Sequence, residues 1–262
     1  MTDLDGTLVA RDLELVDRSA VAIRAWIDDE HECIVATGRN EESARRYHAA
    51  LGLQSPMILF NGARVVAASG EVLLSRTLGD AWPTLRRDVL STLPPTVGAV
   101  AFVDDRAIVV RDAPALTDYA RRDRIALLHD PLADDAEVTK VMLIVPAPPM
   151  DALADRVRAV CPELVVVASE PTYLEVLPAD ATKGTALRWL AADRGVDLAD
   201  VAAIGDNPND IPMIEVAGLG IAVGDGHPDV VASADLVVGP CASGAVADAV
   251  EAISGATASR SH

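Results

Sequence analysis

The sequence predicts an α/β protein in which a doubly wound parallel sheet is interrupted by a smaller α+β insertion. Short apolar runs alternate with helical patterns at both ends of the 262-residue chain, which is typical of parallel strands joined by helices. The middle instead carries strand-like runs in close succession. We therefore expect a discontinuous core of residues 1–74 and 178–262, and an insertion of residues 75–177.

The first part of the core is expected to hold two helices and two buried strands. Apolar residues recur on one helical stripe in the first helix, and the second ends at Gly52, a residue favoured after a helix. The predicted helices are 17–29 and 41–51, and the predicted strands are 33–36 and 57–60.

The second part of the core continues the same alternation. Gly195 ends the first of its helices, which begins at Lys183. The predicted helices are 183–194, 211–217 and 245–253, and the predicted strands are 201–204, 220–223 and 236–238. The small, polar tail 254–262 is expected to be frayed.

The insertion has a different order of elements. Strands are expected at 97–103, 107–111, 138–145, 164–167 and 173–177, with a helix at 150–160. Asp104, Asp105 and Arg106 form a plausible hairpin turn between the first two strands, and a proline-rich patch at 146–149 precedes the helix.

Composition restricts the possible function classes. The formal net charge of −18 disfavours nucleic acid as a partner, because its phosphates would be repelled. No apolar run approaches the roughly 18 residues of a membrane span, no signal peptide is visible, and the three cysteines are scattered without metal-ligand spacing. We expect a cytoplasmic protein that binds neither nucleic acid nor membrane and is a monomer or a weak homodimer.

Two carboxylates lie two residues apart near the start of the chain. Asp3 and Asp5 are followed at once by Gly6 and Thr7. In an extended segment both carboxylates would point to the same side, and Gly6 would allow a sharp turn. Such a pair can hold a divalent metal, or it can divide the roles of nucleophile and acid/base. A surface turn would use the same residue types, so this stretch alone leaves both interpretations open.

Two further motifs lie at predicted helix starts. Thr37, Gly38 and Arg39 follow a strand, where a hydroxyl and free backbone amides suit a phosphate oxygen, although an N-capping threonine would look the same. Lys183 is one of only two lysines, and a cation at a helix start opposes the helix dipole. Its position therefore favours a functional role over that of a solvated surface lysine.

A polar turn from Gly205 to Asp210 follows the strand predicted at 201–204. It contains Asp206, Asn207, Asn209 and Asp210, whose oxygens are the ligands that Mg²⁺ prefers. An ordinary polar loop would share this composition. Open α/β sheets bind ligands at the carboxyl ends of their strands, however, which favours a site here.

The four motifs, in this order, resemble those of the haloacid dehalogenase (HAD) superfamily. They read D-x-D-G-T at 3–7, T-G-R at 37–39, K-G at 183–184 and G-D-x-x-N-D at 205–210. The insertion, the segment Asn61–Gly62–Ala63 and the segment 174–178 resemble the Cof-type phosphatases, which carry a type IIB cap. The resemblance covers nearly the whole chain. It implies a Rossmann-like core with a type IIB cap domain, and a Mg²⁺-dependent phosphatase acting on a sugar phosphate or similar phosphomonoester.

The resemblance also implies roles for individual residues. Asp3 would be the nucleophile that forms an aspartyl phosphate, and Asp5 would move the proton of the leaving group and then of the attacking water. Mg²⁺ would be held by Asp3, the backbone carbonyl of Asp5, and Asp206. The phosphate would be bound by the Leu4 amide, Thr37, Gly38, Lys183 and Asn209. Arg39, Asn61 and Asp210 would support the site or contact substrate.

The cap residues Asp104, Arg106 and Lys140 are weaker candidates for substrate contacts, since each is more often a solvated or structural charge. Two alternative functions share the fold. One is a phosphomannomutase-like phosphomutase, and the other is a non-catalytic metabolite-binding protein, which the presence of every motif residue disfavours.

Charge supports the need for a metal. Two unit charges 4 Å apart repel by about 4 kcal/mol at an effective dielectric of 20, so a phosphate would be repelled by the site's aspartates. Mg²⁺ and Lys183 together would supply three positive charges.

Only Met1 and Thr2 precede Asp3, although typical strands run about 5–6 residues. We therefore expect that the natural chain begins upstream of Met1. The alternative is a short central strand.

Overall fold

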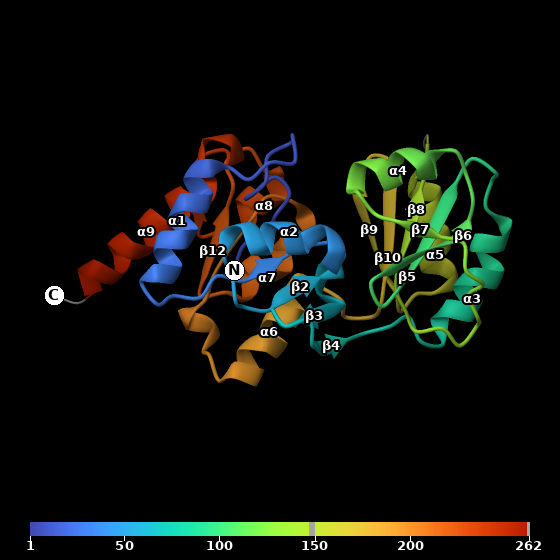
Figure 1. Cartoon of the computed structure of the whole chain (residues 1–262), viewed down its shortest axis with the longest axis horizontal. Helices are drawn as coiled ribbons and strands as arrows, with labels where there is room; N and C mark the ends of the chain where they lie inside the picture. The colour runs from blue at the N-terminus through green and yellow to red at the C-terminus, as the bar shows by residue number, and fades with distance from the viewer. Residues whose placement is uncertain (147–149, 261–262) are drawn as a thin grey trace. The chain divides into compact units, whose positions relative to one another are not determined.

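The computed structural model describes residues 1–146 and 150–260, and their packing forms two units (Figure 1). The first unit contains Met1–Gly38, Ala44–Leu73 and the chain from Thr182 onward. The second contains Leu74–Ala181 together with Arg39–Ser43. The predicted domain boundaries, with residues 75–177 as the insertion, stay a prediction.

The first unit is built on a largely parallel sheet, whose two halves are linked by the first residues of the chain. Thr2 forms parallel bridges to Val35 on one side and to Ile204 on the other. One half has the order β1 (Val35–Ala36), β2 (Met57–Leu59), β3 (Arg64–Val66), β4 (Val72–Ser75). The other has the order β11 (Ala202–Gly205), β12 (Leu219–Ala222), β13 (Leu236–Val237). The β2–β3 pair is antiparallel.

Helices alternate with these strands along the chain. They are α1 (Asp17–Asp28), α2 (Glu41–Leu51), α6 (Lys183–Arg194), α7 (Ile211–Val216), α8 (Pro228–Ser233) and α9 (Ala245–Arg260). Short 3₁₀ turns occur at Phe60–Gly62, Leu198–Asp200, Pro208–Asp210 and Cys241–Ser243. Helix α1 packs against α9, and α6 packs against α7.

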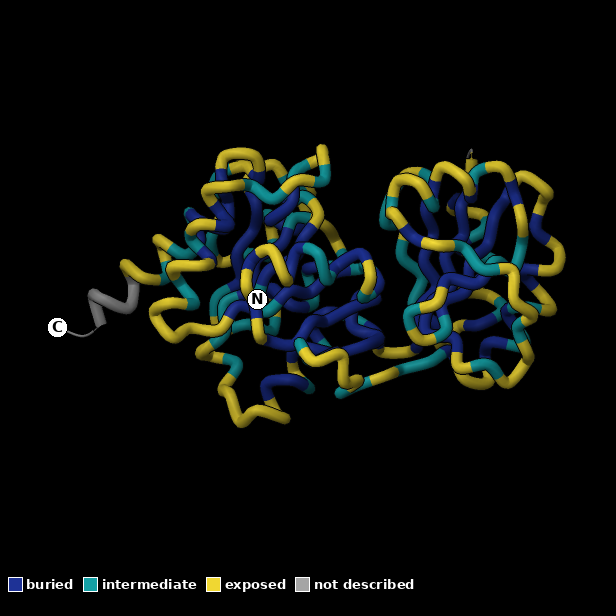
Figure 2. The backbone as a smooth tube through the Cα atoms, viewed as in Figure 1, coloured by how far each residue is buried: buried dark blue, intermediate teal, exposed yellow. Residues whose placement is uncertain are grey.

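Strand β1, next to the first residues, and its neighbour β2 are made of buried residues (Figure 2). All residues of β1 and β2 are buried, and they are aliphatic or methionine. Parallel strands covered on both faces have such continuous apolar runs. This explains why the pattern of the sequence identified these strands, whereas exposed strands such as β4 gave no clear signal.

The second unit contains a six-stranded sheet. Its order is β7 (Leu127–Leu128), β6 (Arg106–Arg111), β5 (Gly98–Val103), β8 (Val138–Ile144), β10 (Tyr173–Leu177), β9 (Val165–Glu170). All neighbours are antiparallel except β6 and β7. Its helices are α3 (Ala81–Asp88), α4 (Ala115–Asp123) and α5 (Met150–Val160), with a 3₁₀ turn at Leu90–Thr92.

The two faces of this second sheet differ. Helices α3 and α5 cover one face with an apolar cluster that includes the fully buried Trp82 and Val141. The other face carries α4, whose Tyr119 contacts Tyr173 edge-to-face. It also carries a buried ion pair between Lys140 and Glu175, with Nζ and Oε2 2.8 Å apart.

The structure confirms the predicted fold class, a mixed α/β protein with a parallel sheet. Its differences from the predicted elements have physical causes. Helices α3, α4 and α8 were not predicted; α3 and α8 carry Pro83 and Pro228 in their first turns, where proline is tolerated. The last helix continues to Arg260 instead of ending at residue 253, so the expectation of a frayed tail was wrong for residues 254–260. Residues 261–262 and most of the proline-rich patch, 147–149, lie outside the described residues.

Among the helices of the described residues, none is both long enough and apolar enough to cross a bilayer.

Candidate active site

Lys183 is the centre of the site. It is the first residue of α6, where Thr182 and Thr185 form a capping box, and its side chain is fully buried. Its ammonium Nζ donates to Asp3 Oδ1 and to Asp210 Oδ1, each 2.5 Å away. A Cβ on the next residue, Gly184, would lie 2.1 Å from the Pro212 carbonyl oxygen. The close approach of α6 and α7 that places Lys183 therefore requires glycine.

Asp210 fixes the loop that follows β11. Its Oδ2 accepts hydrogen bonds from the backbone amides of Asp206 and Asn207, both at 3.0 Å. Because Oδ1 binds Lys183, both oxygens of this fully buried carboxylate already have donors. These hydrogen bonds allow Asp210 to hold both Lys183 and the loop in place.

Residues of the first motif, 3–7, hold Asp206 in place. Thr7 donates its hydroxyl to Asp206 Oδ1 at 2.8 Å. A Cβ at Gly6, whose φ is +84°, would lie only 2.3 Å from Asp206 Oδ2. Glycine at this position serves both the turn and the close approach of the two loops. Sequence reasoning gave Thr7 no role, although its place in the D-x-D-G-T motif was the available signal.

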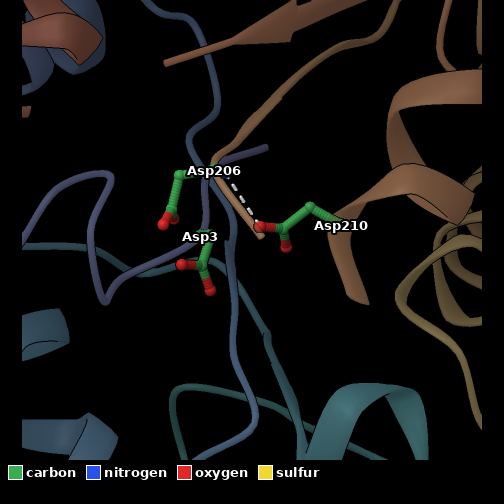
Figure 3. Close-up of side chains that lie close together, drawn as sticks. All are labelled: Asp3, Asp206 and Asp210. Atoms are coloured by element: carbon green, nitrogen blue, oxygen red, sulfur yellow. Dashed lines mark hydrogen bonds between the residues drawn. The ribbon is translucent and has the colours of Figure 1, made fainter. Parts of the chain in front are cut away.

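Three carboxylates converge at this point (Figure 3). One oxygen from each of Asp3, Asp206 and Asp210 lies within 4.8 Å of the others. Burial raises the pKa of Asp3 well above its ordinary value despite the Lys183 charge, and burial with the Asp210 charge raises the pKa of Asp206 to about 7. Burial alone would lower the pKa of Lys183, but the Asp210 and Asp3 carboxylates raise it overall.

This group of residues fits a divalent cation. Three carboxylates against one ammonium leave two negative charges in excess when all are ionised. Carboxylate oxygens are hard ligands of the kind that Mg²⁺ prefers, and a divalent ion would balance the excess. Asp3 and Asp206 are better suited to direct ligation than Asp210, whose oxygens already accept hydrogen bonds.

Asp5 does not join this carboxylate group among the described residues. Its side chain is exposed, whereas Asp3 is buried. The segment is not extended, since the chain bends at Leu4. Beside the larger effect of burial, however, the Asp5 charge raises the pKa of both Asp3 and Asp206, so Asp5 lies near the group. That both carboxylates point the same way stays a prediction. The carbonyl of Leu4, which is fully buried, accepts the amides of Thr7, Leu8 and Val9.

Asn61 connects the second motif, residues 37–39, to the fourth motif, residues 205–210. Thr37 follows β1 and is buried, and its carbonyl accepts the Asn61 amide at 3.0 Å. A Cβ at Gly38 would lie 3.1 Å from Asn61 Oδ1, and the same oxygen accepts Asn209 Nδ2 at 2.9 Å. Asn61 adopts a left-handed conformation with φ of 55°, which asparagine tolerates better than most residues. Arg39 groups with the second unit by its packing.

The comparison with known proteins identifies the family. The profile of haloacid dehalogenase-like hydrolases matches residues 1–250. The chain belongs to this family.

Two similar proteins and one solved structure extend the comparison. The HMP-PP phosphatase of Cronobacter sakazakii is 31% identical over 254 residues, covering 94% of this chain and 91% of that protein. The putative phosphatase YxeH of Bacillus subtilis is 30% identical, with 89% of each chain covered. The solved HAD subclass IIB sugar phosphatase BT4131 shares the fold, with a TM-score of 0.83, 19% identity and 97% of each chain covered. The HAD family membership makes the chain an enzyme of the hydrolase class.

Proposed function

We propose that this HAD enzyme is a Mg²⁺-dependent phosphatase that hydrolyses a small phosphorylated metabolite, such as a sugar phosphate, through an aspartyl phosphate. The observation that carries the proposal is the buried Asp3 carboxylate, held 2.5 Å from the Lys183 ammonium beside Asp206. The phosphatase names of the relatives support the same reaction class.

Asp3 is the nucleophile in this proposal. Its burial removes competing water, and Lys183 orients one oxygen and leaves the other available for attack on phosphorus. Lys183 also supplies a fixed positive charge where negative charge gathers on the transferring phosphoryl group.

Asp5 is the proposed general acid and base. Its exposed side chain is two residues from Asp3, so it can reach the leaving oxygen without competing for Lys183. The proposed phosphate contacts are the Leu4 amide, Thr37, Gly38 and Asn209. Arg39 and Asn61 are proposed as supporting or substrate-contacting residues.

Asp3, the carbonyl of Asp5, and Asp206 would hold the Mg²⁺ ion. When bound, the ion would offset the carboxylate charge and stabilise the charge on the phosphoryl group. Thr7 and Gly6 keep Asp206 in place for this role through the contacts described above.

A phosphate-release assay over a panel of phosphorylated metabolites tests this proposal. We expect wild-type protein with Mg²⁺ to release inorganic phosphate, and Asp3→Asn to release none above background, since the nucleophile is lost. Asp28→Asn, an exposed aspartate on α1, is the matched control and should keep full activity. Activity that persists in Asp3→Asn would contradict the proposed nucleophile.

Metal dependence is tested on the same panel. EDTA should abolish phosphate release, and excess Mg²⁺ should restore it. Activity in metal-free protein would contradict the Mg²⁺ proposal. Interconversion of sugar phosphates without phosphate release would instead favour a phosphomutase.

We also propose a cytoplasmic location and a monomeric or weakly dimeric state. Cell fractionation tests the location, and sedimentation at several protein concentrations tests the oligomeric state.

A further inference from the structure

Residues 8–16, directly after the first motif, fold back as a small hairpin. Val9 in this hairpin forms a bridge with Asp5. The Val9 amide donates to the Leu4 carbonyl at 2.7 Å, and the Val9 carbonyl accepts the Gly6 amide at 2.9 Å. Because these two hydrogen bonds flank Asp5, the hairpin holds the backbone on both sides of the proposed general acid and base.

The hairpin is closed by its own backbone hydrogen bonds. The Val16 amide donates to the Leu8 carbonyl at 3.1 Å, and the Ala10 amide donates to the Glu14 carbonyl at 3.0 Å. At the turn, Leu13 has a φ of +66°. This left-handed conformation is strained for a bulky side chain and persists only where other contacts hold it. The turn therefore needs support from the rest of the first unit.

Tyr47 of α2 provides this support. Its side chain is buried, and its hydroxyl donates to the Leu13 carbonyl at 2.9 Å. The same hydroxyl oxygen accepts a hydrogen bond from the Arg46 guanidinium, whose central carbon lies 4.4 Å from the centre of the Tyr47 ring. Since Arg46 donates to this oxygen, the hydroxyl hydrogen is directed to the Leu13 carbonyl. The turn of the hairpin is thus held against a helix.

We infer that Tyr47 is a positioning residue for Asp5. The inference rests on the proposed function, in which Asp5 donates a proton to the leaving oxygen as the phosphorus–oxygen bond breaks. Asp5 is exposed, so packing does little to fix its carboxylate, and the hairpin sets the place of its backbone. Loss of the Tyr47 hydroxyl would release the turn at Leu13. Asp5 would then spend less time within hydrogen-bond reach of the leaving oxygen.

Substrates with different leaving groups test this inference. The best sugar phosphate of the panel releases a strongly basic alkoxide that needs the proton, whereas p-nitrophenyl phosphate releases a weakly basic phenolate that departs without it. The kcat/KM for each substrate reports the phosphoryl transfer in which the leaving group departs. We expect Tyr47→Phe to lower kcat/KM by about 10-fold for the sugar phosphate and by less than about 2-fold for p-nitrophenyl phosphate. Asp5→Asn should show the same selectivity with a loss of about 100-fold or more.

A double-mutant cycle separates positioning from a general structural effect. In the Asp5→Asn background, Tyr47→Phe should cause no further loss on the sugar phosphate, since the group that it positions is already absent. Arg46→Met removes the donor to the Tyr47 hydroxyl and should reproduce the selective loss in weaker form. Arg45→Met is the matched control, because this neighbouring arginine donates to the Ala68 carbonyl and should leave both values unchanged.

The outcomes distinguish this inference from the proposed function. Equal losses on both substrates in Asp5→Asn would contradict the role of Asp5 as general acid, and the inference with it. A selective loss in Asp5→Asn, together with equal losses or no loss in Tyr47→Phe, would overturn the inference alone. Activity on p-nitrophenyl phosphate also shows that each variant is folded.

Discussion

At the scale of single residues, Lys183 explains how a strongly acidic chain can concentrate carboxylates at one point. Its buried ammonium contacts Asp3 and Asp210 together, so one cation offsets two neighbouring negative charges. An ammonium at a helix start is unfavourable for the helix dipole. The Asp3 and Asp210 carboxylates offset this unfavourable interaction, and they also fix the position of the Lys183 side chain.

Replacing Lys183 tests this role. We expect Lys183→Ala to lower kcat/KM by at least about 100-fold, because the positive charge facing the phosphoryl group is lost. Steady-state kinetics on the best substrate of the panel provide the measurement. A urea midpoint taken on the same sample separates lost chemistry from lost folding, and a folded variant with normal kcat/KM would contradict the proposal.

His48 is a residue outside the site whose protonation should matter for stability. It is buried, its Nε2 lies 2.8 Å from the Ser55 carbonyl oxygen, and burial lowers its pKa. A lowered pKa means that the unfolded chain binds a proton more readily than the folded one. The contribution to stability is therefore present above about pH 6.5, the ordinary value, and is lost as the pH falls below it.

Urea midpoints measured between pH 8 and pH 5 test this sign. We expect the midpoint of wild-type protein to fall more steeply than that of His48→Gln, which lacks the titrating group. His129→Gln, at an exposed histidine, should follow wild-type protein. A steeper fall in His48→Gln than in wild-type protein would reverse the assignment.

Much of the site's residue set could be predicted from the sequence, because polar residues at strand ends are a local signal. Asp3, Lys183 and Asp206 were predicted to act together, and the structure brings them together. The exposure of Asp5 could not be predicted in this way. The chain bends at Leu4, whose carbonyl accepts three backbone amides, and such a turn depends on backbone hydrogen bonds that the residue pattern does not reveal.

At the scale of elements, β8 and β10 carry an ion pair where an apolar pair would be expected. Lys140 and Glu175 are almost completely buried. Removing one partner of a buried pair leaves an uncompensated charge, which costs about 3–5 kcal/mol, whereas replacing both with apolar residues is often much less costly. The predicted contact of Lys140 with substrate stays a prediction.

A double-mutant cycle tests the pair. We expect Lys140→Met to lower the free energy of unfolding by about 3 kcal/mol, and Lys140→Met with Glu175→Leu to lower it less. Chemical denaturation of the two single variants and the double variant provides the values. If the free energy of unfolding of the double variant falls by the sum of the two single decreases, the two residues do not interact energetically.

The elements also show which sequence signals failed. Local patterns gave α2, α5 and α6 within their observed bounds: α2 and α5 are amphipathic, and a glycine follows α2 and α6. The two-residue strands β7 and β13 are defined only by their neighbours in the sheet. The pattern predicted a strand near β13 and none at β7, because tertiary pairing decides such short elements.

At the scale of the whole molecule, each unit has a core of its own. The second unit buries Trp82, Leu85 and Val141 within one cluster that belongs to its own sheet and helices. A unit with a separate core and about 100 residues is of the size that folds independently.

Expression of residues 74–181 alone tests this independence. We expect a cooperative thermal transition by circular dichroism and dispersed amide resonances. Trp82→Ala in the same fragment should abolish the transition, because loss of a buried tryptophan costs about 3–5 kcal/mol. A fragment without a cooperative transition would show that the core of the second unit needs the rest of the chain.

The pairing of Met1 with β11 has a consequence for synthesis on the ribosome. The Met1 nitrogen and its acceptor on Ala202 are 201 residues apart in sequence. At about 5–20 residues per second, Met1 waits roughly 10–40 seconds after its own incorporation for this partner. During that time the edges of β1 and of the first residues are open to other chains. The second unit can already be complete by then, so the sheet of the first unit closes around Thr2 only after Leu74–Ala181 has been made.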